Sequence, residues 1–217
     1  MIYVVYLAIA VISYLLGSLN FGIILSNKLM KDDVRTHGSG NAGTTNMLRS
    51  YGKKFAILTI IGDMLKVVVA IVIAFLIRKY IPINDKEINS VFTSIDQNML
   101  LKSFAGFFCA LGHIFPCFFN FKGGKGVATM GAMVFCVDWK IGLILLGVFI
   151  IVVAVTRYVS LGSILIAVFY PVLIYVFHKS LILTGIAFIF TLIVIISHRG
   201  NIKKLINHTE NKINLKK

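Results

Sequence analysis

The sequence is poor in acidic residues, with eight Asp and Glu against 22 Lys and Arg and a formal net charge of +14. Charged residues of both signs make up only 14% of the 217 residues, whereas soluble domains usually have about 25%. This deficit excludes an ordinary soluble globular protein, and the 58% of hydrophobic residues excludes a disordered chain. The excess of positive charge indicates anionic partners, such as phosphate compounds, lipid head groups or nucleic acid.

The sequence also has little that suggests metal or disulfide chemistry. The three cysteines, Cys109, Cys117 and Cys136, lie within apolar runs and have neither disulfide nor metal-ligand spacing. No pair of histidines has the spacing of a metal site on one helix face, and the acidic residues form no divalent-cation cluster. We therefore expect no metal and no cofactor.

Long apolar runs dominate the chain. Each is long enough for a membrane-spanning helix at about 1.5 Å per residue, and the lack of strand-like alternation excludes a membrane barrel. Five runs are clear: Ile2–Leu25, Phe55–Ile77, Met99–Phe119, Leu161–Phe177 and Leu181–Ser197. Within the second run, Asp63 and Lys66 are expected to face the bundle interior and to pair. We prefer a mutually neutralising structural pair to the alternative, a proton relay. His113, in the third run, is interpreted as a packed, hydrogen-bonded residue.

The stretch Gly126–Thr156 is ambiguous because Asp138, Trp139 and Lys140 interrupt it. As two short spans, it gives seven crossings and places fifteen Lys and Arg on one side against six on the other. As one span, it gives six crossings and a split of nine against eleven. Basic residues favour the cytoplasmic side. We therefore predict an all-α integral membrane protein with seven transmembrane helices, the N-terminus outside and the C-terminus cytoplasmic, as a single membrane-embedded domain over residues 1–217.

With this topology every unusual polar cluster falls on the cytoplasmic face. The four clusters are His37–Asn46 with Arg49, Lys122–Gly126 with Thr129, Arg157–Ser160, and His198–Lys204 continuing to Glu210. Glycines allow backbone N–H groups to converge on an anion, and a helix that begins after such a loop adds its positive dipole end. The first two clusters are therefore interpreted as phosphate-binding loops, and His198 is the histidine that we expect to act, at a helix end that favours its protonated form.

Gly38, Gly40 and Gly43 match the spacing of the dinucleotide-binding fingerprint. That motif requires a preceding strand and a parallel sheet, and here membrane helices lie on either side. We therefore reject a dinucleotide site.

Two classes of function fit phosphate loops on one membrane face: an enzyme of phospholipid metabolism, or a carrier of phosphorylated solutes. Carriers place substrate groups near the bilayer midplane in repeated halves, and this sequence has no repeated halves, which favours the enzyme. An acyltransferase with a His-x4-Asp pair is excluded because no histidine has an aspartate five residues later. A reaction without a strong protein base suits an activated donor such as an acyl phosphate.

Three motifs carry a resemblance to a known family. Gly38–Asn46 with Arg49, Gly123–Thr129, and His198-Arg199-x-Asn201-Ile202 with Glu210 resemble, in order, the motifs of the bacterial acyl-phosphate:glycerol-3-phosphate acyltransferases, the PlsY family. One departure is His208, since the family commonly has Gly shortly before its Glu. The resemblance implies a seven-helix enzyme of the bacterial plasma membrane that moves a fatty acyl group from acyl phosphate to glycerol 3-phosphate. The products are lysophosphatidic acid and phosphate, in the first acylation of phospholipid biosynthesis.

The resemblance also implies the site residues. The implied catalytic residues are Ser39, Arg49, Lys125 and His198, which with Asn201 hold the phosphate of glycerol 3-phosphate. The implied substrate-binding residues are Gly38, Gly40, Asn41, Gly43, Thr44, Asn46, Gly123, Gly124, Gly126, Thr129, Ser160 and Asn201. Glu210 is interpreted as a structural brace. The expected partners are both substrates, membrane lipids and the soluble enzyme that makes acyl phosphate; no nucleic acid is expected.

Overall fold

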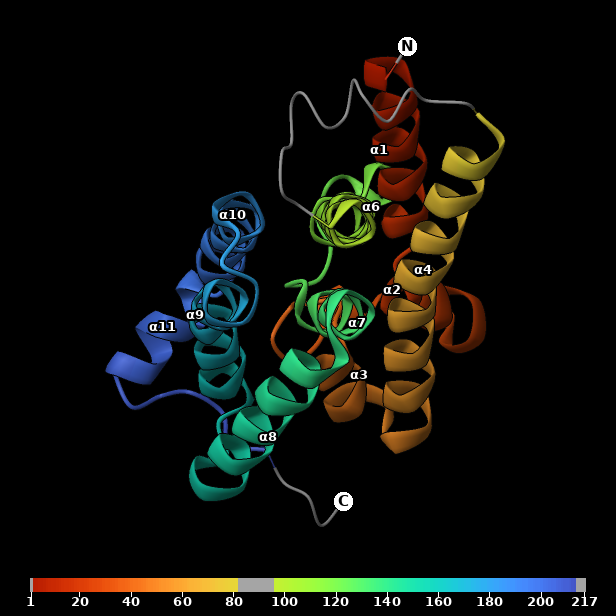
Figure 1. Cartoon of the computed structure of the whole chain (residues 1–217). Coiled ribbons are helices and arrows are strands. Elements are labelled where there is room, and N and C mark those ends of the chain that lie inside the picture. Colours follow the sequence, from red (N-terminus) through yellow and green to blue (C-terminus); the bar gives the residue numbers. More distant parts are fainter. Residues whose placement is uncertain (1, 82–95, 214–217) are drawn as a thin grey trace. The chain divides into compact units, whose positions relative to one another are not determined.

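The computed structural model describes residues 2–81 and 96–213, and every regular element in these two ranges is helical (Figure 1). The all-α fold expected from the apolar runs is confirmed. The chain forms two compact units, residues 1–137 and residues 138–217.

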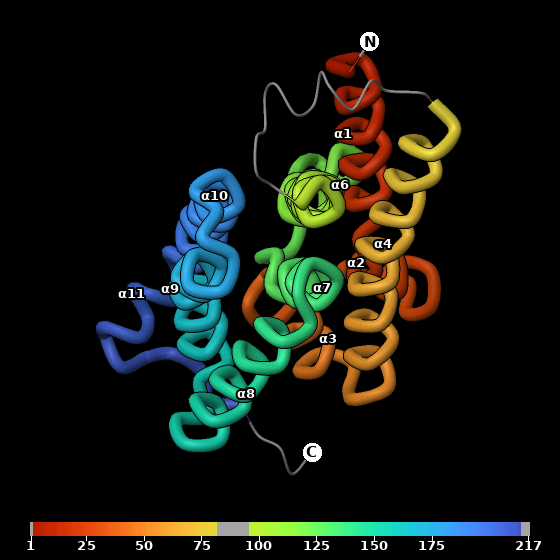
Figure 2. The backbone as a smooth tube through the Cα atoms, in the orientation of Figure 1, coloured from red at the N-terminus to blue at the C-terminus, as the bar shows by residue number. Residues whose placement is uncertain are grey.

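Unit 1 (residues 1–137) is a helical bundle in which α6 packs against α1, α4 and α7. Helix α1 also packs along α4, as Figure 2 shows. The elements are α1 (Ile2–Ser18), α2 (Phe21–Leu25), η1 (Ser26–Met30), η2 (Val34–Thr36), α3 (Thr44–Tyr51), α4 (Lys53–Tyr80), α6 (Gln97–Ile114), η3 (Cys117–Phe119) and α7 (Val127–Val137).

Helices α1 and α6 approach until their backbones touch. A Cβ on Gly17 would lie 1.9 Å from the carbonyl oxygen of Cys109, and one on Gly112 would lie 2.1 Å from that of Tyr14. Small residues at such crossings are typical of helix pairs in membranes, where close van der Waals packing replaces the hydrophobic drive.

The expected span Ile2–Leu25 is not one continuous helix. The α-helix ends at Ser18, and a second one begins at Phe21 with Asn20 as its N-cap. The Asn20 side-chain carbonyl accepts a hydrogen bond from the amide of Ile23 at 3.3 Å, which satisfies a donor of the new first turn. The break leaves carbonyl groups at the end of α1 available for other partners.

The other expected boundaries shift by a few residues. Helix α4 extends the expected Phe55–Ile77 at both ends, and α9 extends Leu161–Phe177 in the same way. Helix α6 ends at Ile114, before the expected Phe119. Pro116 explains this early end, because a proline drives the preceding residue, here Phe115, out of the helical conformation.

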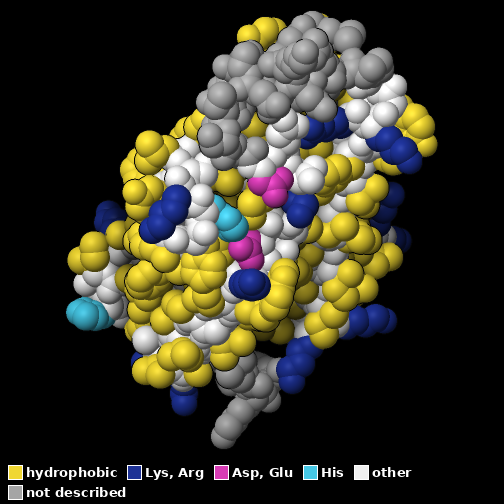
Figure 3. All heavy atoms as spheres, viewed as in Figure 1, with side chains coloured by type: hydrophobic (Ala, Val, Ile, Leu, Met, Phe, Trp, Pro, Cys, Tyr) yellow, Lys and Arg dark blue, Asp and Glu magenta, His cyan; other side chains and the backbone are white. Residues whose placement is uncertain are grey.

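Most of the predicted apolar spans correspond to helices that are able to cross a membrane. Among residues 2–81 and 96–213, five segments are long and apolar enough to cross a bilayer alone, and α10 with α11, bent by 61°, makes a possible sixth. Helix α7 is apolar but has only 11 residues. Apolar side chains dominate the face seen in Figure 3, as expected of a lipid-facing surface. The count of seven crossings and the orientation of the termini stay predictions.

Unit 2 (residues 138–217) consists of α8 (Trp139–Thr156), α9 (Val159–His178), α10 (Leu181–Ser197) and α11 (Arg199–Ile206). Asp138, one of the polar residues expected to interrupt Gly126–Thr156, caps α8 by accepting from the amide of Lys140 at 2.8 Å. Helix α9 packs against both α8 and α10. The hydroxyl of Thr191 on α10 donates to the carbonyl of Ala167 on α9 at 2.6 Å, which links these two helices.

The segment after α11 turns back sharply. Its amides close the helix as a Schellman motif, with His208 bonded to Leu205 at 3.2 Å and Thr209 bonded to Lys204 at 2.8 Å. His208 has φ of 55°, a conformation that glycine normally supplies at this position. The turn therefore forms without the family's glycine. Farther on, the amide of Ile213 donates to the carbonyl of Arg157 at 2.9 Å, so the tail returns to the α8–α9 turn.

Candidate functional site

The first glycine loop, residues 37–43, is organised by Asn46. The Asn46 side-chain oxygen accepts from the amide of Ser39 at 2.9 Å, and its nitrogen donates to the carbonyls of Val34 and His37 at 2.9 and 3.0 Å. Asn46 is buried. We expected it to contact substrate; the structure shows its side chain bonded to the backbone of the loop.

Two glycines of this loop are required by its shape. Gly38 and Gly40 have φ of 55° and 70°, in the left-handed region that glycine adopts without strain. A Cβ on Gly38 would also lie only 2.3 Å from the side-chain oxygen of Asn46. The side chain of Asn41 accepts from the amide of Gly43 at 3.0 Å, which closes the turn before α3. These residues thus build the loop, and the Ser39 side chain is left exposed on it.

Helix α3 begins directly after the loop, with Gly43 as its N-cap and Thr44 as its first residue. The Thr44 hydroxyl oxygen is buried and makes no hydrogen bond in the structure. A buried polar atom without a partner costs free energy unless a ligand or water satisfies it. Together with the unpaired N–H groups of the first helical turn, this hydroxyl makes the start of α3 suited to an anion.

An open hollow of about 290 Å³ lies beside the loop. It is lined by Asp32, His37, Gly38, Arg49, Ser50 and Tyr51. Gly38 and Arg49 belong to the residue set expected from the sequence. A guanidinium at such a hollow suits bidentate binding of a phosphate group.

Asp32 contacts both His37, at the start of the first loop, and Tyr51, at the end of α3. Its carboxylate accepts from the Tyr51 hydroxyl at 2.8 Å and lies 2.6 Å from Nε2 of His37. The Tyr51 bond lowers the pKa of Asp32, and burial, together with that same bond, raises the pKa of Tyr51 to about 12. The acid is therefore held ionised and the phenol protonated across the neutral pH range, which keeps the contact intact.

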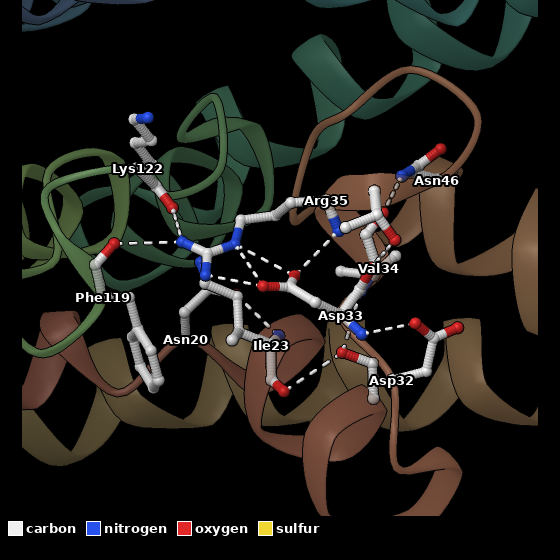
Figure 4. A network of polar contacts seen from close by, with 11 residues as sticks. Asn20, Ile23, Asp32, Asp33, Val34, Arg35, Asn46, Phe119 and Lys122 are labelled. Atoms are coloured by element: carbon white, nitrogen blue, oxygen red, sulfur yellow. Dashed lines mark hydrogen bonds and ion pairs between the residues drawn. The ribbon is translucent and has the colours of Figure 1, made fainter.

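Arg35 joins the first loop to the second. Its guanidinium binds the carboxylate of Asp33, with Nη2 to Oδ2 at 2.7 Å, and this contact lowers the pKa of Asp33. Its Nη1 donates to the backbone carbonyls of Phe119 and Lys122, at 3.0 and 3.1 Å, in the segment that leads to the second loop (Figure 4). Nothing in the sequence indicates this link, since Arg35 stands there only as one more positive charge.

The second glycine loop, residues 123–126, folds back onto the end of α6. The amide of Gly123 donates to the carbonyl of Ile114 at 3.2 Å, and that of Gly124 donates to the carbonyl of His113 at 3.0 Å. Gly126 has φ of 83° and leads into α7. Thr129, expected to contact substrate, donates its hydroxyl to the carbonyl of Gly126 at 2.9 Å, which stabilises this helix start.

A buried polar cluster lies below this loop. The ammonium of Lys66 is 2.8 Å from the carboxylate of Asp63, and both side chains are almost fully buried. The expected pairing of these two residues inside the bundle is confirmed. The His113 ring completes the cluster, with Nδ1 3.1 Å from Nζ of Lys66. Its interpretation as a packed, hydrogen-bonded residue is also confirmed.

In unit 2 the third motif forms around Glu210. One oxygen of its carboxylate accepts from the Ser160 hydroxyl and from the Asn201 side-chain amide, both at 2.8 Å. Glu210 thus braces the C-terminal segment, as expected. His198 caps α10 and is buried, and its Nδ1 lies 2.8 Å from the carbonyl of Val194. Since a carbonyl only accepts, Nδ1 carries the proton, and Nε2 is the basic nitrogen of the neutral ring.

The expected site residues therefore gather in two groups. In unit 1, Arg35, just before the first loop, bonds to the carbonyls of Phe119 and Lys122, just before the second loop that carries Lys125. In unit 2, Ser160 and Asn201 share Glu210, and His198 lies at the α10–α11 bend. Within residues 2–81 and 96–213, no three His, Cys, Asp or Glu side chains gather as a metal site. That both groups face one pocket stays a prediction.

Comparison with known proteins identifies the family. The sequence profile of the family described as glycerol-3-phosphate acyltransferase matches residues 7–208. The chain belongs to the glycerol-3-phosphate acyltransferase family. It is an acyltransferase and a multi-pass integral membrane protein, as the sequence predicts.

Similar relatives of this family cover nearly the whole chain. The glycerol-3-phosphate acyltransferase of Clostridioides difficile is 40% identical over 214 residues, which are 98% of this chain and 97% of that protein. The one of Bartonella henselae is 38% identical over 206 residues, 94% of this chain and 90% of that protein.

Two crystal structures of PlsY, an integral membrane glycerol 3-phosphate acyltransferase, are also similar. Its glycerol 3-phosphate form has a TM-score of 0.81 at 33% identity, over 96% of each chain. Its lysophosphatidic acid form has a TM-score of 0.78 at 32% identity, over 96% of this chain and 95% of that one. The likeness extends over both units of the chain.

Proposed function

We propose that this acyltransferase moves a fatty acyl group from acyl phosphate to the 1-hydroxyl of glycerol 3-phosphate, giving lysophosphatidic acid and inorganic phosphate. The observation that carries the proposal is the family membership over residues 7–208, combined with two glycine loops whose preceding segments Arg35 ties together. The PlsY structures with glycerol 3-phosphate and with lysophosphatidic acid support the acceptor and the product.

In this proposal residues 1–217 form one catalytic domain with seven membrane crossings, the N-terminus outside and the C-terminus in the cytoplasm. Both glycine loops and the third motif then face the cytoplasm, where glycerol 3-phosphate and the soluble enzyme that makes acyl phosphate are found. The acyl chain lies among the helices and the surrounding lipid. No metal or cofactor is required.

The site residues divide between the two anionic substrates. Ser39, Arg49 and Lys125 bind the phosphate of glycerol 3-phosphate, together with His198 and Asn201 of unit 2. The backbone of the first loop and the Thr44 hydroxyl face the phosphate of the donor, where the buried hydroxyl without a partner would gain one. Two anions repel each other unless cations and backbone donors neutralise them.

The chemistry needs positioning more than a strong base. The 1-hydroxyl oxygen attacks the acyl carbonyl carbon, the new ester bond forms, and the bond from that carbon to the phosphate oxygen breaks. Phosphate leaves with the electron pair and takes up the hydroxyl proton. Correct placement of two reactants is worth up to ~7–11 kcal/mol. Nε2 of His198 is the alternative proton acceptor, since Nδ1 is held by Val194.

The proposal is tested by incubating purified protein with acyl phosphate and glycerol 3-phosphate and following phosphate release. Turnover with acyl-CoA in place of acyl phosphate would contradict the donor. Uptake of an intact phosphorylated solute into vesicles, with no new product, would favour the carrier. His198→Gln separates the two proton acceptors: loss mainly of affinity supports positioning, and loss of kcat with affinity intact supports the base.

A further inference from the structure

The His113 ring forms the floor of the second glycine loop. A Cβ on Gly124 would lie 2.0 Å from Nε2 of His113 and 2.7 Å from its Cε1, so the loop backbone rests directly on the imidazole. The same residue also accepts the Gly124 amide with its carbonyl, at 3.0 Å. Lys125 follows Gly124 in the chain, so the contacts of His113 with Gly124 help to place the Lys125 backbone.

The ring itself is held from its other side. Nδ1 of His113 is 3.1 Å from Nζ of Lys66 and 3.4 Å from Nδ2 of Asn20. The Asn20 amide is oriented by its cap bond, in which Oδ1 accepts from Ile23. The Asp63 carboxylate also lies 3.4 Å from Nδ1, so three side chains hold one edge of the ring while its other edge, at Nε2, lies beneath Gly124.

Lys66 is in turn fixed by other groups of unit 1. Its ammonium donates to the carbonyls of Gly17 and Leu19 at 2.8 and 3.0 Å, and it pairs with Asp63 at 2.8 Å. These carbonyls are the ones left by the break between α1 and α2. The ion pair is buried and internally neutral, so Lys66 stays at one place beneath the ring.

We propose that Lys66 and His113 are positioning residues, which hold the Gly123–Gly124 backbone and thereby place Lys125 for the phosphate of glycerol 3-phosphate. A rigid support matters because small misplacements at a preorganised site cost rate steeply. The catalytic part of this inference rests on the proposed function, whereas the effect on the loop does not.

His113→Leu tests this support of the loop, because leucine fills the site but makes no polar contact with Lys66, Asn20 or Asp63. We expect the protected amides of Gly123 and Gly124 to exchange hydrogen at least about tenfold faster, measured by mass spectrometry on peptides covering residues 119–126. In the same preparation, kcat/KM falls at least about tenfold at an unchanged size-exclusion profile. Thr191→Val, which removes a buried hydrogen bond of unit 2, is the control and leaves both readouts as in the wild type.

The double variant Asp63→Asn/Lys66→Met is the second test, in case His113→Leu does not fold. It removes both charges together, so no unpaired charge is buried, and it should also speed the exchange of the two amides. Unchanged exchange in the folded variants would overturn the inference, and so would faster exchange with unchanged kcat/KM. If the wild type does not turn over acyl phosphate while the amides respond as expected, the proposed function fails and the support of the loop by His113 stands.

Discussion

Replacing Gly123 by alanine tests how closely the second glycine loop packs on the end of α6. The new Cβ would lie 2.0 Å from the carbonyl oxygen of His113 and 2.6 Å from Cδ of Pro116. A carbon–oxygen contact normally needs about 3.3 Å, so the loop and the helix end must separate by roughly 1 Å. Neither a backbone carbonyl nor a proline ring can rotate away. Gly123 has no left-handed φ, so the substitution adds a clash without backbone strain.

A displacement of about 1 Å at a preorganised site costs about 100-fold in rate. We therefore expect kcat/KM of Gly123→Ala to fall on the order of 100-fold, measured as phosphate release from acyl phosphate by purified, monodisperse protein. The matched control is Gly131→Ala in α7, where a Cβ meets nothing within 4 Å. That change keeps wild-type activity and gains about 1 kcal/mol of helix propensity. Activity of Gly123→Ala within about threefold of the wild type would refute the packing argument.

Three further substitutions test separate features. Arg35→Gln removes the donors to the carbonyls of Phe119 and Lys122, together worth about 2 kcal/mol, so kcat/KM should fall by up to about 30-fold. Wild-type kinetics would contradict a link between the two segments. His208→Gly relieves about 1 kcal/mol of strain from the left-handed backbone and should raise Tm by ~2–4 °C. A lower Tm would show that the His208 side chain stabilises the fold by more than this strain costs. Glu210→Ala leaves the donors of Ser160 and Asn201 without their acceptor and should destabilise the folded C-terminal segment by about 1–3 kcal/mol, seen as faster proteolysis of residues 207–213. Glu210→Gln keeps an acceptor oxygen and should restore most of the protection.

The hydrophobic runs were enough to predict the fold class, and the glycine motifs were enough to indicate the family. The apolar runs predict helices because a bilayer leaves few other ways to satisfy the backbone. Asp63 and Lys66 were predictable as a pair, since charges at that depth have few alternatives to pairing. Glu210 was expected to be a brace on the family resemblance, and its bonds to Ser160 and Asn201 agree with that.

Other parts of the site depend on contacts between segments distant in sequence. Nothing local indicates that Arg35 reaches the carbonyls of Phe119 and Lys122, more than 80 residues away. Likewise, Asn46 in a motif is equally compatible with a ligand contact and with holding its own loop, and only the folded loop distinguishes them. The break after Ser18 was missed because apolar residues surround Asn20, and hydropathy alone does not register one capping side chain.

The break between α1 and α2 has a consequence for insertion into the bilayer. In the part of the chain that the structure describes, Lys66 donates to the carbonyl of Gly17 on α1 and to that of Leu19 at the break, and it pairs with Asp63 on α4. Its contact with the His113 ring of α6 is a further one. Ribosomes deliver α1 and α4 before α6. The pair of helices α1 and α4 can therefore enter the bilayer with Lys66 already neutralised and hydrogen-bonded. The later helices then pack against a surface that carries no unpaired charge from this lysine.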